Sequence, residues 1–174
     1  MYVTIASVLA EKGSDAVHTV TADTSVARVA SMMASHGIGA VLVMADGKLA
    51  GIFTERDALT RVLGCDLDAT VTPVHAVMTK DPVFVEPTTS VQDALALMSQ
   101  RRSRHLPVVG PEGALVGMVS VGDLTQAHLH AYLRQVDVMA AGVRRMLPQG
   151  RFTGVVDLTR ILFSSLRRVW RPER

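Results

Sequence analysis

The chain has 174 residues, of which 48% are apolar and 20% charged, with a formal net charge of +2 at pH 7. This composition supports a hydrophobic core and excludes global disorder, while a single cysteine, Cys65, excludes an internal disulfide and is typical of a reducing compartment. No stretch approaches the roughly 18 uninterrupted apolar residues of a membrane helix, and the first residues lack a signal-peptide layout, so we expect a soluble cytoplasmic protein.

The first half of the chain predicts a strand, a helix, two strands and a second helix. Thr24 or Ser25 can cap the first helix, and Gly37 can end it. Apolar positions between them keep helical spacing, whereas the continuous apolar run after Gly37 is typical of a buried strand. The predicted ranges are a strand at 17–20, a helix at 26–36, strands at 40–44 and 49–53, and a helix that begins after Thr54.

The second half predicts the same elements in the same order. Their ranges are a strand at 83–85, a helix from residue 91 to Arg101 and Arg102, strands at 106–109 and 115–119, and a helix that begins after Ser120. Each half is therefore a β-α-β-β-α unit, which predicts an α/β protein of the α+β type with helices on one face of a mixed sheet. A sheet of this size is marginally stable alone, so we expect the halves to pack together in a pseudo-two-fold arrangement.

A sequence repeat supports this division. The phrase 47–57 recurs at 113–123 with a spacing of 66, and Thr24-Ser25-Val26 matches Thr89-Ser90-Val91 with a spacing of 65. Two copies of this length predict a tandem domain pair, because a solenoid needs three or more units. The predicted domains are 1–70 for the first repeat with the N-terminal segment and linker, 71–126 for the second repeat, and 127–174 for a C-terminal helical extension.

The repeated phrase places a hydroxyl and a carboxylate three residues apart at the start of a helix. The pairs are Thr54 with Asp57, and Ser120 with Asp123. Free N–H groups at a helix start favour an anion such as phosphate, and a carboxylate one turn further suits the two hydroxyls of a ribose. The same spacing is also a helix-capping pattern that needs no ligand. Recurrence after a glycine-containing apolar strand favours the nucleotide-binding interpretation.

These motifs give the chain a resemblance to a known family. The chain resembles the tandem cystathionine-β-synthase (CBS) domain pair, or Bateman module, of the small stand-alone bacterial or archaeal type. The resemblance covers residues of about 3 to 125. The matching phrases are 8–13, 36–40, 51–57, 72–82, 104–108 and 117–123.

The resemblance implies regulatory binding of an adenosine-containing ligand in clefts between the repeats. AMP, ADP or ATP is expected first, with S-adenosylmethionine or NAD as alternatives, and no metal is expected. Ribose and phosphate would bind at the two motifs, and backbone groups and apolar walls would meet the base. The residues implied for the base are Thr19, Val20, Thr21, Phe84 and Val85 through the backbone, and Ile38, Ala40, Leu106 and Pro107 as walls. A homodimer and an unidentified regulated protein are the implied partners.

The two repeats differ in the charges near the motif. Arg56 stands where the second copy has Gly122, and Arg104-His105 precede a strand where the first copy has Ile38-Gly39. Fixed positive charge favours phosphate through charge-assisted hydrogen bonds. We therefore predict unequal clefts, with phosphate contacts mainly from Arg56, Arg104 and His105. Arg101 and Arg102 are better explained as a solvated helix end than as phosphate ligands.

The sequence does not predict an enzyme. It contains no nucleophile-elbow, Walker or HExxH pattern. His128 and His130 lie two residues apart, which places them on different faces of a helix, and Cys65 lacks the partner spacing of a zinc or thiol site.

The C-terminal segment has a charge of its own. Residues 1–124 carry 9 basic and 13 acidic residues, whereas residues 125–174 carry 9 arginines and 3 acidic residues. Apolar spacing predicts one helix from Leu129 to Pro148 and a second from near Asp157. A helical hairpin that covers apolar surface is one interpretation. The alternative is a regulator that contacts nucleic acid or an anionic membrane through residues 155–174.

Overall fold

The structure, a computed structural model, describes residues 3–12 and 17–146. The chain divides into two compact units, 1–129 and 130–174, and both sequence repeats lie in the first unit. It contains both strands and helices, and the predicted α/β class and tandem repeat are confirmed.

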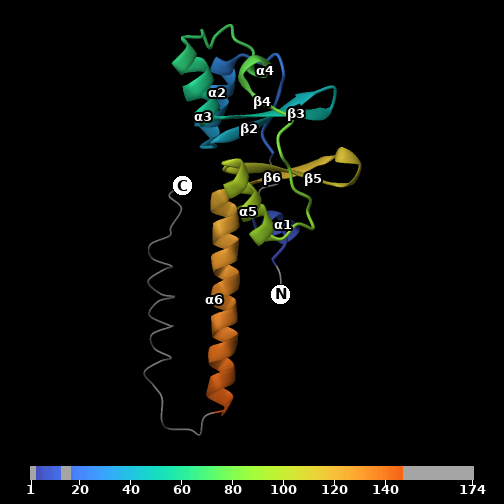
Figure 1. Ribbon diagram of the computed structural model, residues 1–174, viewed down its shortest axis with the longest axis vertical. Coiled ribbons are helices and arrows are strands. Elements are labelled where there is room, and N and C mark those ends of the chain that lie inside the picture. Colours follow the sequence, from blue (N-terminus) through green and yellow to red (C-terminus); the bar gives the residue numbers. More distant parts are fainter. Residues whose placement is uncertain (1–2, 13–16, 147–174) are drawn as a thin grey trace. The chain divides into compact units, whose positions relative to one another are not determined.

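The first repeat is built on a four-stranded sheet in the order β1-β2-β3-β4 (Figure 1). β1 runs parallel to β2, and the remaining pairs are antiparallel. The elements are β1 (Thr19–Thr21), α2 (Val26–His36), β2 (Ala40–Ala45), β3 (Lys48–Thr54), α3 (Glu55–Asp57), η1 (Ala58–Val62), η2 (Leu63–Cys65), α4 (Val74–Val77) and β4 (Thr79–Lys80). The predicted order is thus present, although the first strand begins two residues later than expected.

The second repeat follows the same plan with less sheet. Its elements are α5 (Val91–Arg101), β5 (His105–Val109), η3 (Pro111–Gly113), β6 (Leu115–Ser120) and α6 (Val121–Met146). The predicted strand at 83–85 is reduced to one parallel bridge between Val85 and Val108. This bridge lies 65 residues after the pairing of Val20 with Val43 in the first repeat. The register irregularity of β2 also recurs at the same spacing in β5.

The central strand of the first repeat is buried on both faces. Val41 and Val43 pack with the helices of their own repeat. Ala40 and Leu42 alternate with them and pack, with Leu115 of β6, in a separate cluster. Successive strand residues point to opposite faces. Because both faces of β2 are buried, its sequence is an unbroken apolar run. This cluster joins the two sheets, as expected from the small size of each.

The N-terminal helix packs with the repeat that is more distant in sequence. α1 (Ile5–Lys12) contributes Ile5 and Val8 to the core formed with α5 and β6 (Figure 1). Conversely, α4 lies between the repeats in sequence and packs in the core of the first. The predicted boundaries at 70/71 and 126/127 stay predictions.

The helices expected after Ser120 and from Leu129 are one helix, α6. Nothing in the sequence between them breaks a helix, since no proline or turn cluster separates the two apolar stripes. The predicted end at Pro148, the helix near Asp157 and the arginine-rich segment 155–174 lie outside the described residues.

Packing within the chain accounts for the glycines in the two motif strands. A Cβ at Gly51 would collide with the side chain of Met78 and lie 2.9 Å from the carbonyl oxygen of Thr79. A Cβ at Gly117 would lie 2.9 Å from Leu9. In both repeats a neighbouring segment of this chain packs so closely against the glycine that a side chain there would clash.

We expect Gly51→Ala to lower the free energy of unfolding by about 1–3 kcal/mol, because a backbone oxygen cannot move aside as easily as a side chain. Gly122→Ala is the matched control. Its Cβ would lie 3.5 Å from the Ser120 hydroxyl, an ordinary contact, so stability should stay unchanged or rise by up to about 1 kcal/mol. Urea unfolding measures both, and equal stability of the two variants would contradict the packing argument.

Candidate functional site

The first motif forms a closed hydrogen-bonding unit at the junction of β3 and α3. Asp57 Oδ2 accepts hydrogen bonds from the backbone N–H of Thr54 at 3.0 Å and from its hydroxyl at 2.7 Å. The backbone N–H of Asp57 donates in return to Thr54 Oγ1 at 3.3 Å. This is a reciprocal capping box. The capping alternative raised by the sequence is therefore present, with Asp in the place often taken by Glu or Gln.

The second motif repeats this geometry and adds a lysine from α1. Asp123 Oδ2 accepts from the Ser120 N–H at 2.8 Å and lies 2.9 Å from the ammonium group of Lys12. Burial raises the pKa of Asp123, but the hydrogen bonds from Ser120 and the charge and hydrogen bond of Lys12 outweigh it. The net pKa of Asp123 is below its ordinary value, so the carboxylate is charged at neutral pH.

Arg61 ties the first motif to the segment that connects the repeats. Its Nε lies 3.4 Å from Asp57 Oδ1. Its NH1 group donates to the carbonyl oxygens of Val77 at 3.1 Å and Met78 at 2.7 Å. Asp57 itself is only 7% exposed, so this arginine both neutralises a buried carboxylate and fixes the chain that leads to β4.

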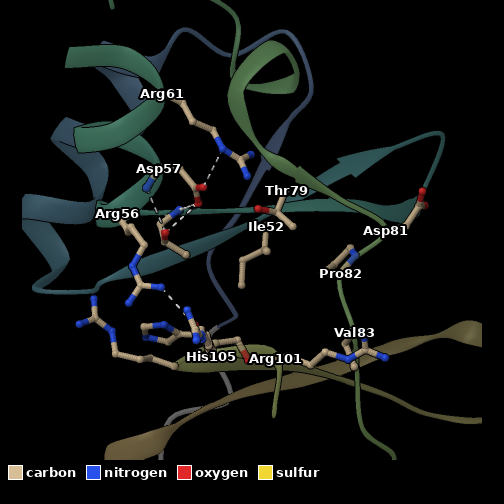
Figure 2. Close-up of a pocket in the computed structure, with 14 residues that line it drawn as sticks. Ile52, Arg56, Asp57, Arg61, Thr79, Asp81, Pro82, Val83, Arg101 and His105 are labelled. Carbon is tan, nitrogen blue, oxygen red and sulfur yellow. Dashed lines mark hydrogen bonds and ion pairs between the residues drawn. The ribbon is translucent and has the colours of Figure 1, made fainter. Parts of the chain in front are cut away.

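A cleft of about 340 Å³ opens beside the first motif (Figure 2). One wall comes from the end of β3 and the helical segment after it, another from the chain around β4, and a third from the end of α5 and the start of β5. The lining residues are Ile52, Thr54, Arg56, Asp57, Arg61, Thr79, Asp81, Pro82, Val83, Arg101, Arg102, Ser103, Arg104 and His105. Five arginines thus face two carboxylates, and both repeats contribute.

Arg56 connects the two repeats across this cleft. Its NH1 group donates to the carbonyl oxygen of Arg102 at 3.1 Å, the contact drawn between the walls in Figure 2. Arg104 lies opposite with a distance of 3.9 Å from NH2 to Oε2 of Glu55, at the limit of an ion pair. Ser103 also lines the cleft, and its buried hydroxyl oxygen has no hydrogen-bond partner among the described residues. Arg56, Arg104 and Ser103 therefore form few hydrogen bonds or ion pairs within the described structure.

His105 is kept neutral in this surrounding. Burial is the largest cause that lowers the pKa of His105, and the positive charges of Arg104 and Lys12 lower it further. Asp123 and Glu55 oppose the shift without reversing it. An approaching anion would act in the same direction as these carboxylates and favour protonation of the imidazole.

Comparison with protein families identifies the fold. The model of the CBS domain matches twice, at residues 13–64 and 74–130. The chain belongs to the CBS-domain family. It contains a tandem CBS pair, and the resemblance seen in the sequence is confirmed.

Related proteins and similar solved structures also belong to the CBS-domain family. The mitochondrial CBS domain-containing protein CBSX3 of Arabidopsis thaliana is 34% identical over 149 residues, which cover 81% of this chain and 72% of that protein. The structure of a CBS-domain protein from Burkholderia ambifaria has 36% identity and a TM-score of 0.69, covering 74% of this chain and 95% of that one. The structure of CBSX2 in complex with AMP has 27% identity and a TM-score of 0.58, covering 67% and 90%.

The structure brings together part of the residue set expected from the sequence. Those that line the cleft are Thr54, Arg56, Asp57, Arg104 and His105. The others lie elsewhere: Thr19, Val20 and Thr21 form β1, Ser120 and Asp123 form the second motif, and Ile38, Ala40, Phe84, Val85, Leu106 and Pro107 lie outside the lining of this cleft. Ala40 and Leu106 are 0% and 1% exposed; Ala40 packs in the cluster that joins the sheets and Leu106 in the core of the second repeat. Their contact with a base stays a prediction.

Several lining residues were missed by the sequence reasoning. Arg61 stands one helical turn after Asp57, a spacing that could have indicated it. The stretch 79–83 belongs to a matching family phrase but has no polar pattern that marks a site. The sequence favours a solvated helix end for Arg101 and Arg102, and only the fold places that end in the cleft.

Other site types receive no support from the described residues. Across 3–12 and 17–146, no three His, Cys, Asp or Glu side chains gather as a metal site. Within the same ranges, no helix is long and apolar enough to cross a membrane.

We expect Asp123→Asn to lower the free energy of unfolding at pH 7 by about 1 kcal/mol, since the amide keeps the shape but loses the pairing with Lys12. The folded pKa of Asp123 lies below its ordinary value of 3.8. The stabilisation by the wild-type carboxylate is therefore complete above that value and is lost as the pH falls below it. Urea unfolding from pH 7 to pH 3 should show the two proteins converging. A difference that does not change with pH would contradict this assignment.

Proposed function

We propose that this CBS pair is a regulatory sensor that binds an adenosine nucleotide in the cleft beside Thr54 and Asp57. The observation that carries the proposal is the cleft itself, where a hydroxyl-carboxylate motif from one repeat meets arginines from both. Ile52, Pro82 and Val83 add apolar surface suited to a base. The AMP complex of the related CBSX2 supports this ligand class.

Binding would use the groups that the protein leaves available. Arginines supply charge-assisted hydrogen bonds to phosphate, and Asp57 Oδ1, already 3.4 Å from Arg61, can accept from a ribose hydroxyl. In this proposal the motif caps the helix and binds the ligand with different lone pairs. No step of bond making or breaking is assigned, and the protein is not proposed to be an enzyme.

The signal would be a shift between arrangements of the two repeats. Arg56 bridges them through the carbonyl of Arg102, so a phosphate that engages Arg56 alters an inter-repeat contact directly. A ligand shifts such an equilibrium only by its difference in affinity for the two arrangements. We propose a homodimer and a regulated partner protein as the recipients of this shift. The nucleic-acid or membrane alternative depends on residues 155–174, which the described structure does not include.

Isothermal titration calorimetry of the full chain with AMP, adenosine and GMP tests the proposal. We expect AMP to bind with a dissociation constant in about the micromolar range and adenosine to bind more weakly, because it lacks phosphate. Arg104→Ala should weaken AMP binding about tenfold. The unfolding free energy should change by less than about 0.5 kcal/mol, since its ion pair is long and exposed.

Arg28→Ala is the matched control, an exposed arginine of α2 outside the cleft lining. It should bind AMP like the wild type. Absence of binding by AMP, or equal loss in both variants, would contradict the proposed site.

The lowered pKa of His105 gives a second test. Phosphate beside the imidazole would raise that pKa towards or above the ordinary value of 6.5, so binding should take up a proton. AMP affinity of the wild type, relative to His105→Gln, should therefore rise as the pH falls from 8 to 6. This comparison cancels the titration of the nucleotide itself. Parallel pH profiles of the two proteins would place the phosphate away from His105.

A further inference from the structure

The cleft beside the first motif has an excess of positive charge. Arg61 and Arg104 are paired with Asp57 and Glu55, which leaves Arg56, Arg101 and Arg102 without an ion-pair partner among the described residues. His105 adds no positive charge while neutral, because burial and Arg104 lower its pKa. A monophosphate carries about two negative charges near pH 7, and each further phosphate adds about one more. Arg101 and Arg102 line the cleft without an ion-pair partner, so they remain available for further phosphates once a first phosphate binds at Arg104 and Arg56.

None of these arginines has a counterpart at the second motif. With the repeat spacings of 65 and 66, the residues in place of Arg56, Arg61, Arg101 and Arg102 are Gly122, Ala127, His36 and Gly37, and Arg104 aligns with Ile38 or Gly39. The five cations are thus a property of one repeat junction and not of the repeated unit.

The lysine at the second motif is already occupied. Lys12 Nζ lies 2.9 Å from Asp123 Oδ2 and donates to the carbonyl oxygen of Met118 at 3.3 Å. A cation that is paired with a carboxylate in this way offers little attraction to a phosphate, because the pair is nearly neutral. Asp123 is also hydrogen-bonded to Ser120, so the second motif is satisfied by the protein's own groups.

Arg102 occupies a backbone position that the fold would fill better with glycine. It ends α5 in the left-handed conformation, with φ 51° and ψ 33°. The equivalent residue at the end of α2 is Gly37, with φ 62° and ψ 35°. Side chains with a Cβ are disfavoured there. Its side chain is exposed at the cleft and forms no ion pair with any described residue. A residue in this conformation that lines a cleft is a candidate for a binding role.

We infer that only the cleft at Thr54 and Asp57 binds phosphate, and that it takes an adenosine nucleotide with two or three phosphates in preference to AMP. The inference rests on the proposed function, because it assumes that this cleft is the nucleotide site. Arg104, Arg56 and the unpartnered hydroxyl of Ser103 receive the first phosphate, and Arg101 and Arg102 receive those beyond it.

Calorimetry of the full chain with AMP, ADP and ATP, without divalent cations and at constant ionic strength, tests this inference. We expect ADP and ATP to bind at least about tenfold more tightly than AMP, with one ATP bound per chain. Arg102→Gly is the decisive variant, because it removes the side chain while supplying the residue that the backbone favours. Its melting temperature should equal or exceed that of the wild type, its ATP affinity should fall about tenfold, and its AMP affinity should change less than about threefold.

Arg28→Gln removes one positive charge outside the cleft and controls for long-range electrostatics. ATP affinity that falls equally in this control would overturn the assignment to Arg102. ATP binding no tighter than AMP would overturn the polyphosphate preference while leaving the proposed function in place. Two ATP molecules bound per chain with similar affinity would overturn the single phosphate cleft. Failure of all three nucleotides to bind would instead refute the proposed function, and with it this inference.

Discussion

Burial of the second face of the β2–β3 sheet is the constraint on which the rest of the structure depends. Helices cover one face through Val41 and Val43, and Ala40, Leu42 and Ile52 remain on the other. These side chains are at most 8% exposed, and Leu115 and Met118 of the second repeat pack against them. Burial of apolar area at roughly 25 cal/mol per Å² makes this junction a major stabilising contact. Ile52 belongs both to this junction and to the lining of the cleft, so the proposed ligand site adjoins the inter-repeat contact.

Exchange of helices strengthens the link between the repeats. α1 hydrogen-bonds to the second repeat through Ile5 and Thr89 at 2.9 Å, and the segment before α4 does so to the first through Thr72 and Val26 at 2.9 Å. Each core is therefore completed by a segment from outside its own β-α-β-β-α unit. Lys12 at the end of α1 and the stretch 79–83 after α4 reach the two motifs by this route. Each motif therefore contacts a segment that links the two repeats: α1 at the second motif and the chain around α4 at the first.

The motif has a structural role as a helix cap, and the proposed binding role would be added to it. Its capping hydrogen bonds use Asp57 Oδ2 and both groups of Thr54, which leaves Oδ1 towards Arg61 and the cleft. A cap of this kind contributes on the order of 1 kcal/mol, so its presence in two copies is explained without a ligand. The two copies differ in the neighbouring charges. Arginines lie beside Asp57, whereas Asp123 is paired with Lys12.

By itself, the sequence determined the local structure and the family. Apolar spacing, Gly37 and the run at 40–44 predict helices and strands because these signals act over a few residues. The repeated phrase predicted both motifs, and the differences between the two copies singled out Arg56, Arg104 and His105. Only the tertiary structure placed α1 in the distant core, merged two predicted helices into α6 and brought Arg61, Arg101 and Arg102 to the cleft. Such placements depend on which surfaces must be buried between segments far apart in the chain, and no local pattern encodes that choice.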